Sequence, residues 1–357
     1  MSSSRTRSPT RIRTNSQRTS KLSRSFAART ADDVGAEPRT AIHQPVLVGE
    51  VLRFLAPERD GWFVDCTVGL GGHAAELLAR FPGARVLGID RDEEALAHAR
   101  RRLREFGARA FLVHGNFHSI DEIVAEAGTG KPAGILADLG VSSLQLDQPE
   151  RGFSFRRSGP LDMRMDQSTR SATRTARDMV NLESQSVLET VLRDYGEERQ
   201  ARKIARAIVE RRRGRPIETT DELRELVHET VGSSRTRRGR AVPGSRSIDT
   251  ATRTFQALRI AVNEELSGLG PALERAVNLL ERDGRLVVIS YHSLEDRIVK
   301  HRLRASALGE VDPVTGRPRA ETRLIELMTR KPIRPQPSEV QYNPRSRSAR
   351  LRAARRL

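Results

Sequence analysis

Short apolar runs alternate with amphipathic stretches in the first part of the globular sequence. The apolar runs have the length of buried strands, and the stretches between them show the spacing of helices that bury one face. Strands separated by helices in this way indicate βαβ units and a parallel sheet. The predicted strands cover residues 62–65, 85–90, 110–114 and 134–138, and the predicted helices cover 45–55, 73–80, 93–106 and 119–127.

After Asp166 the strand pattern stops, and it returns only once, late in the chain. A Gly-, Ser- and Arg-rich linker at 232–247 separates two groups of amphipathic helices. One more apolar run, at 286–290, has the pattern of a buried strand. The helices predicted in this part are 180–195, 198–212, 220–231, 251–266, 271–281 and 294–303.

The simplest architecture is an α/β domain that is interrupted by an all-helical insertion. We predict the α/β domain at residues 39–149 and 248–342, and the insertion at 150–247. The flanking segments are predicted to be a disordered basic arm at 1–38 and a basic tail at 343–357.

The net charge of +17 is concentrated at the two ends of the chain. Residues 1–31 carry seven Arg and one Lys, residues 344–357 carry six Arg, and neither segment contains an acid. Such segments commonly bind nucleic acid through its phosphates, although a solubilising arm has the same composition. The first segment also resembles an organellar transit peptide, but its few large apolar residues favour a disordered arm of a cytosolic protein.

Among 357 residues there is a single cysteine, Cys66, and no apolar run as long as a membrane span. One cysteine excludes an intramolecular disulfide and a cysteine-based zinc site, and it fits a reducing compartment. The eight histidines are scattered, without an HExxH or EF-hand pattern, so no metal is predicted. We therefore expect a soluble, cytoplasmic protein with a substantial core.

Glycines follow the first predicted strand in the order GxGG, at Gly69, Gly71 and Gly72. Glycines here let the backbone approach a nucleotide-like ligand, and an acid at the end of the second strand, Asp90, can hold ribose hydroxyls. The pattern departs from the GxGxxG that favours a pyrophosphate, which makes a nicotinamide-dependent oxidoreductase less favoured. S-adenosylmethionine has no phosphate and suits the looser pattern; the alternative is a simple strand–helix turn. Cys66 is expected to be a small buried residue.

Polar residues follow each of the later strands. Phe117, after the third strand, could contact an adenine or could be a core residue. The loop after the fourth strand holds Asp138, Ser142, Ser143 and Gln145. If the substrate is a base amine, its delocalised lone pair requires hydrogen-bond acceptors beside it, and these residues could supply them. The alternative is a long surface loop with ordinary turn residues.

The residues after the late strand, Ser290 to Arg297, could line the same cleft. They could equally cap a helix, because Ser293 and Asp296 resemble a capping box. His73 is expected at a helix start near the ligand.

From about His43 onward the chain resembles the ribosomal RNA small subunit methyltransferase H family, also called MraW. Together the shared motifs are highly specific, whereas a lone glycine loop would not be. They are GLGGH (69–73), GIDRD (88–92), DLGVSS with QLD (138–147), RGFSF (151–155), GPLDMRMD (159–166), YGEER (195–199), ATRTFQALRIAVNEEL (251–266), HSLEDRIVK (292–300) and NPRSRSARLR (343–352).

The resemblance implies a class I S-adenosylmethionine-dependent methyltransferase, with a Rossmann-like, mostly parallel sheet and an inserted all-helical domain. The implied reaction methylates N4 of a cytidine in the decoding region of 16S ribosomal RNA, on the small ribosomal subunit. For this reaction the chemistry of the loop after the fourth strand makes Asp138, Ser142 and Ser143 the candidate catalytic residues. The family's cofactor-binding residues match Gly71, Gly72, His73, Asp90, Phe117, Asp138 and Gln145.

Four positions depart from the family's usual residues, and none of them removes a cofactor residue. The family typically has Asp at Ala133, Pro at Leu144, His-Pro at 249–250 and Phe at Tyr291. A second hypothesis is a ribosome-assembly or RNA-binding factor that keeps the fold without turnover. The intact glycine motif and Asp90 favour the enzyme.

Overall fold

The computed structural model describes residues 45–56, 58, 60–168, 173–232 and 249–357. The predicted arm at 1–38 and nearly all of the predicted linker lie outside the described residues. None of the described helices is both long and apolar enough to cross a membrane.

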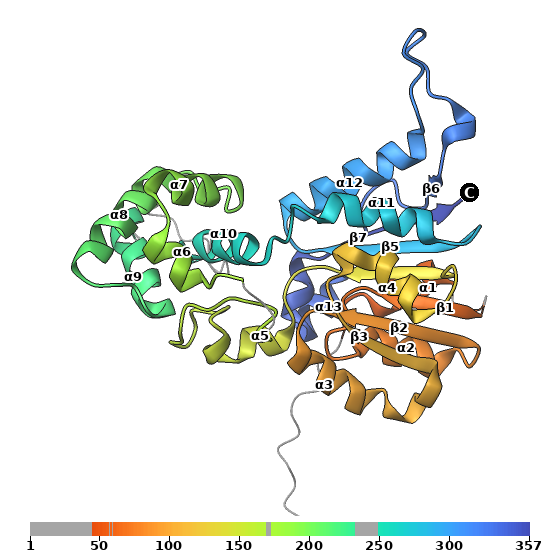
Figure 1. Cartoon of the computed structure of the whole chain (residues 1–357), viewed down its shortest axis with the longest axis horizontal. Helices are drawn as coiled ribbons and strands as arrows, with labels where there is room; N and C mark the ends of the chain where they lie inside the picture. The colour runs from red at the N-terminus through yellow and green to blue at the C-terminus, as the bar shows by residue number, and fades with distance from the viewer. Residues whose placement is uncertain (1–44, 57, 59, 169–172, 233–248) are drawn as a thin grey trace, which may run out of the picture. The chain divides into compact units, whose positions relative to one another are not determined.

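A mixed seven-stranded sheet, in the order β3-β2-β1-β4-β5-β7-β6, forms the centre of the α/β part (Figure 1). The first five strands are parallel, so their carboxyl ends meet at one edge. The inner strands read as continuous apolar runs because both of their faces are covered. All five strands lie where the sequence predicts them: β1 Gly61–Asp65, β2 Ala84–Asp90, β3 Ala110–His114, β4 Gly134–Asp138 and β5 Arg285–Ser290.

The prediction of a basic tail at 343–357 is wrong for its second half. Arg350–Arg356 forms strand β7, which pairs antiparallel with β5 and with β6 (Ile325–Leu327). Leu351, Ala353 and Ala354 are fully buried in this strand. Three of its four arginines pair with acids: Arg350 and Arg352 with Asp296, at 3.6 and 2.7 Å, and Arg355 with Asp283 and Glu326. These arginines of the strand therefore form ion pairs within the fold.

Two layers of helices cover the sheet. Helices α1 (Val48–Leu55), α2 (Gly72–Arg80) and α3 (Glu93–Arg102) contribute to one apolar cluster. A second cluster is formed by α4 (Ile120–Ala127), α11 (Leu269–Leu279) and α12 (Ser293–Leu308). Helices α3 and α12 each begin three residues after a strand ends, at Glu93 after β2 and at Ser293 after β5, which places their first turns beside the strand ends.

The inserted residues fold around their own apolar core, made from five helices. The predicted helix 180–195 is two helices, because Ser184 caps a new one: its hydroxyl accepts from the backbone of Val187. The core also includes Phe255 and Leu258, so it takes in residues beyond the predicted limit at 247. The helices are α6 Ala176–Leu182, α7 Gln185–Asp194, α8 Ala201–Gly214, α9 Thr220–Val231 and α10 Thr252–Asn263.

Two short helices not predicted from the sequence complete the surroundings of the strand ends. Helix α5 (Ser143–Asp147) follows β4 directly. Helix α13 (Pro337–Tyr342) leads into a 3₁₀ turn at Pro344–Ser348. Glu339 of α13 accepts from the backbone N–H of Leu47, which ties this segment to the start of α1.

Candidate active site

A cavity of about 580 Å³ lies at the carboxyl ends of the parallel strands. This is where open α/β sheets bind their ligands. The cavity collects residues from the ends of β1, β2, β3, β4 and β5. The predicted site residues that line it are Gly72, His73, Asp90, Phe117, Asp138, Ser142, Ser143 and Gln145.

Gly71 is the predicted site residue that does not line the cavity. Its φ of 77° is left-handed, and a Cβ there would lie 3.3 Å from the side chain of Leu103. This glycine therefore shapes the turn and its packing against the Leu103 side chain. Gly69, and not Gly71, lines the cavity, and its φ of 52° is also left-handed. Its backbone N–H donates to Asp90 Oδ2 at 2.8 Å.

Asp90 closes the glycine loop and faces the cavity. Backbone N–H groups of Gly69 and Asp92 donate to its two oxygens, at 2.8 and 2.9 Å. Burial raises the pKa of Asp90 to about 6, although these two hydrogen bonds oppose the shift. Each carboxylate oxygen has a further lone pair, so Asp90 can still accept hydrogen bonds from a ribose diol.

Asp138 is held from three sides at the end of β4. Its backbone N–H donates to Thr67 Oγ1 at 2.7 Å. The hydroxyl of Tyr291 donates to Asp138 Oδ1 at 2.8 Å, and Nε2 of His73 lies 3.5 Å from Oδ2. Burial, followed by the charge of Asp138, raises the pKa of Tyr291 well above its usual value, so the phenol stays a donor. The sequence shows Tyr291 as a departure from the family, but does not show this contact.

The predicted catalytic serines have different surroundings. Ser142 caps α5: its hydroxyl accepts from the backbone of Gln145 at 3.3 Å, and Gln145 Oε1 accepts from the backbone of Ser142 at 3.0 Å. The hydroxyl of Ser143 is buried and has no partner among the described residues. Ser142 thus orders the loop, while Ser143 has a free donor and acceptor. The catalytic role of both serines stays a prediction.

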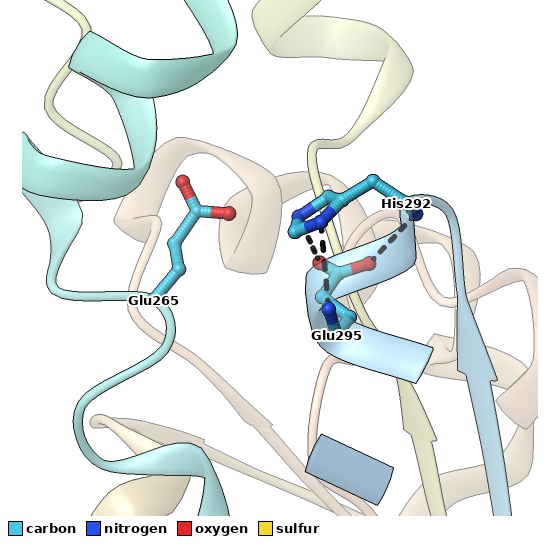
Figure 2. A group of neighbouring side chains, drawn as sticks. All are labelled: Glu265, His292 and Glu295. Atoms are coloured by element: carbon cyan, nitrogen blue, oxygen red, sulfur yellow. Dashed lines mark hydrogen bonds and ion pairs between the residues drawn. The ribbon is translucent and has the colours of Figure 1, made fainter. Parts of the chain in front are cut away.

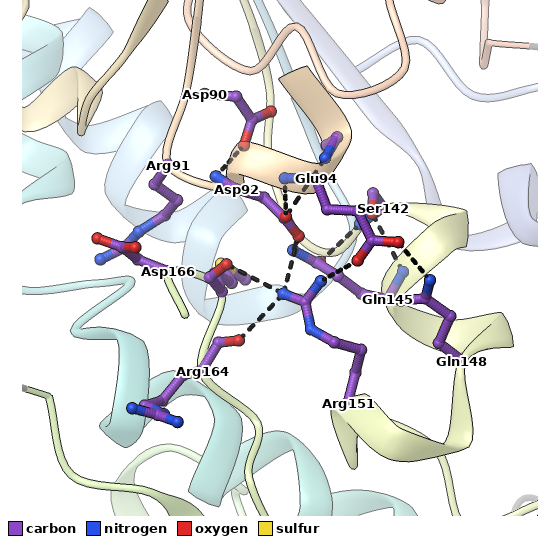
Figure 3. Close-up of polar contacts among 12 residues, drawn as sticks. Asp90, Arg91, Asp92, Glu94, Ser142, Gln145, Gln148, Arg151, Arg164 and Asp166 are labelled. Atoms are coloured by element: carbon purple, nitrogen blue, oxygen red, sulfur yellow. Dashed lines mark hydrogen bonds and ion pairs between the residues drawn. The ribbon is translucent and has the colours of Figure 1, made fainter. Parts of the chain in front are cut away.

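Arg151 forms a buried polar network that the sequence analysis does not predict (Figure 3). It is 3% exposed, and its Nη2 lies 2.9 Å from Asp92 Oδ2. The same nitrogen donates to the backbone carbonyls of Arg164 and Met165. Gln145 Nε2 donates to Asp92 Oδ2 at 2.8 Å. Since Asp92 also caps α3, this network joins the cofactor side of the sheet to the start of the insertion.

The segment after β5 both lines the cavity and caps a helix, which are the two roles that the sequence allows for it. His292, and not Ser293, caps α12 in a capping box with Glu295. Tyr291 and Glu295 line the cavity. Glu265, His292 and Glu295 present ligand atoms within 4.8 Å of one another (Figure 2).

Protein cations already compensate the carboxylates of this cluster. Arg259 makes two hydrogen bonds of 2.9 Å to Glu265. Burial alone would raise the pKa of Glu295, but the hydrogen bond and charge of His292, with the charge of Arg259, lower it. The carboxylates of Glu265 and Glu295 therefore line the cavity with their charges compensated by neighbouring cations.

Phe117 and Cys66 sit as the sequence suggests. Phe117 lines the cavity and also packs against the apolar cluster of α4 and α11, so both of its predicted roles are compatible with its position. Cys66 is buried, and burial raises the pKa of its thiol, which makes it a small packing residue and no nucleophile.

The residues of the cavity fit S-adenosylmethionine. Asp90 can accept from the ribose, Phe117 offers an aromatic face, and the glycine loop leaves room for close approach. His73 is 8% exposed and both of its ring nitrogens lack a hydrogen-bond partner among the described residues, which is costly unless a ligand or a proton is involved. When bound, this cofactor supplies an electrophilic methyl group on a sulfonium.

Comparison with known proteins agrees with this fit. Residues 40–357 match the model of the MraW methylase family. Ribosomal RNA small subunit methyltransferase H of Geobacter sp. (strain M21) is 47% identical over 323 residues, covering 88% of this chain and 98% of that protein. The protein of that name from Sorangium cellulosum is 47% identical over 320 residues, covering 90% and 92%.

Solved structures give more distant similarity. An rRNA methylase from Streptococcus thermophilus aligns with a TM-score of 0.39 at 13% identity, covering 88% of this chain and 98% of the other. A proposed methyltransferase from Streptococcus mutans, in complex with SAH, aligns with a TM-score of 0.39 at 12% identity, covering 88% and 100%.

The sheet, the cavity at its strand ends and the family match define an S-adenosylmethionine-dependent methyltransferase with a Rossmann-like fold. The predicted fold class, enzyme class and cofactor are confirmed. More particularly, the chain belongs to the MraW methylase family, as its motifs predict.

Proposed function

We propose that this enzyme methylates N4 of a cytidine in the 16S RNA of the small ribosomal subunit, in the cytoplasm. The observation that carries the proposal is the Asp138 carboxylate, held by Tyr291 in the cavity that fits the cofactor. The names of the curated relatives support ribosomal RNA as the substrate class.

The chemistry of an exocyclic amine matches this arrangement. The N4 lone pair of cytosine is delocalised into the ring, so an acceptor beside the amine is needed to localise it and to take a proton. Asp138 supplies that acceptor at the edge of the sheet where the cofactor residues meet, and Ser143 adds a second free acceptor within the cavity. Holding the amine in line with the methyl group provides most of the remaining rate enhancement.

The opening of the cavity fits an anionic substrate. Arg156 and Arg347 are exposed cavity-lining residues without an acidic partner among the described residues. Arg345 also lines the cavity and lies 2.5 Å from Asp147. A target base must leave its stack to enter a pocket of this kind, and cations at the opening would hold the flanking phosphates.

The proposal is tested by methyl transfer from labelled S-adenosylmethionine. Small ribosomal subunits that lack the modification are compared with the same RNA free of protein. We expect incorporation into the subunits at one methyl group per particle. Saturable binding of cofactor and of subunits, without incorporation into either substrate, would reject the proposal and favour the non-catalytic assembly factor.

A further inference from the structure

The His73 side chain is a buried group that lies next to the glycine loop and two carboxylates. It stands at the second position of α2, directly after the glycine loop, and is 8% exposed. Both ring nitrogens are buried without a hydrogen-bond partner among the described residues. Leaving a buried donor and acceptor unpaired is unfavourable, so a function is expected for this side chain.

Two carboxylates flank this imidazole. Asp138 Oδ2 lies 3.5 Å from His73 Nε2. Asp65, at the end of β1, lines the same small cavity as His73 and is 5% exposed. Burial raises the pKa of Asp65 to about 7, with the charge of His73 acting in the opposite direction. The imidazole of His73 therefore lies between two carboxylates from different strands.

Tyr291 orients the outermost carboxylate. Its hydroxyl occupies Asp138 Oδ1 at 2.8 Å, which leaves Oδ2 as the oxygen that faces His73. The aromatic ring has room because Gly140 has no side chain: a Cβ there would lie 3.3 Å from Tyr291 Cδ2. The backbone N–H of Tyr291 donates to Glu295 Oε2 at 2.8 Å, which fixes the residue from its other side.

We propose that Asp138, His73 and Asp65 form a relay that removes the proton from the methylated amine. Tyr291 is the positioning residue of this relay. The inference rests on the proposed function for the identity of the amine, and on the geometry for the route of the proton.

The proposed relay moves one proton from the amine to His73. As the amine nitrogen bonds to the methyl carbon, the carbon–sulfur bond breaks and its electron pair stays on sulfur. The nitrogen then carries one proton too many, and Asp138 accepts it. Asp138 passes the proton to His73 Nε2, because an imidazole binds a proton more tightly than a carboxylate does in water. The ionised form of Asp65 stabilises the resulting imidazolium, and His73 releases the proton to water after the product has left.

Further charged groups come from β2, α12 and α13. They are the acids Asp90, Glu295 and Glu339, and the charge of Glu295 is compensated by His292 and Arg259.

The first test is a titration of His73 by NMR in the full-length protein, with the resonance assigned through its loss in His73→Asn. It needs neither RNA nor cofactor. We expect Asp138→Asn and Asp65→Asn each to alter the titration curve of the His73 resonance, since each removes a carboxylate beside the imidazole. The matched control is Asp121→Asn, on exposed surface of α4. A His73 titration that neither cavity variant moves would overturn the relay.

The second test separates a relay from a simple cofactor contact. Single-turnover methyl transfer is measured at saturating cofactor, with the cofactor Kd measured separately. We expect His73→Asn to lower the rate on the order of 100-fold even at saturation, which is the usual size of general acid–base assistance. A rate that recovers fully at saturating cofactor would mean that His73 only binds the cofactor, and would overturn the relay.

Tyr291→Phe tests the positioning role. This substitution keeps the ring and removes only the hydroxyl that donates to Asp138. Because that hydrogen bond favours the charged carboxylate, we expect the acidic limb of the pH–rate profile to move to higher pH, with the cofactor Kd unchanged. An unmoved limb would remove Tyr291 from the relay. Absence of methyl transfer by the wild type would reject the proposed function, and the NMR titration would then decide the relay alone.

Discussion

At the scale of single residues, the site depends on carboxylates whose environments differ. Asp90 is half-buried and accepts from two backbone N–H groups, while Asp138 faces a phenol and an imidazole. The sequence places both at strand ends because acids that follow an apolar run are rarely core residues. It does not show which hydrogen bonds they make, since Thr67, Tyr291 and His73 come from distant parts of the chain.

Cofactor affinity is expected to depend on pH through Asp90. Its pKa is raised to about 6, chiefly by burial, so the fraction able to accept two ribose hydroxyls falls as the pH drops below 6. The cofactor Kd should then rise about tenfold per pH unit, because binding requires the ionised form. Isothermal titration calorimetry between pH 5 and 8 measures this.

Asp90→Asn provides the control for that pH dependence. Its affinity should be lower at pH 8 and nearly independent of pH below 6. A wild-type Kd that stays constant from pH 5 to 8 would show that Asp90 is not the ribose acceptor.

At the scale of elements, local patterns predict the parallel strands well and the C-terminal strand poorly. The strands from β1 to β5 are apolar runs that any position in the sheet interior requires. In β7, arginines are mixed with small apolar residues. This pattern predicts a basic tail because the acidic partners, Asp283, Asp296 and Glu326, are distant in sequence. The predicted limit of the insertion at 247 leaves out α10 for the same reason, since the residues that α10 packs against lie earlier in the chain.

The Arg151 network is expected to stabilise the junction between the sheet and the insertion. In Arg151→Met the buried Asp92 loses its ion pair, and two backbone carbonyls lose a donor. Removing one partner of a buried pair costs about 3–5 kcal/mol. Urea denaturation at pH 7 should show this loss.

The matched control is Arg101→Met, an exposed arginine of α3 without an ion pair assigned to it. It should change the free energy of unfolding by less than about 0.5 kcal/mol. Equal free energies of unfolding for the two variants would mean that Arg151 does not stabilise the junction between the sheet and the insertion.

At the scale of the whole molecule, some arginines form ion pairs within the fold, and others are exposed without an acidic partner among the described residues. The C-terminal arginines of β7 are paired within the fold, whereas Arg156 and Arg347 remain exposed at the cavity. The net charge alone predicts an anionic partner but not this distinction, because pairing depends on the tertiary structure. The residues with which RNA is expected to interact are therefore fewer than the composition suggests.

Replacing the two free arginines should weaken RNA binding without affecting the cofactor. We expect Arg156→Gln and Arg347→Gln each to raise the KM for ribosomal subunits and to reduce the slope of log K against log salt by about 1. The cofactor Kd should stay unchanged, and Arg101→Gln should leave both values unaltered. An increase in cofactor Kd instead would assign these arginines to the cofactor.

The position of the methyl group tests the central claim most directly. RNA from the labelled reaction is digested to nucleosides, and the product is identified by mass spectrometry against methylcytidine standards. We expect N4-methylcytidine from the wild type and at least 100-fold less from Asp138→Asn, which should still bind cofactor. Methyl groups found on carbon, on ribose or on another base, or full activity of Asp138→Asn, would contradict the account.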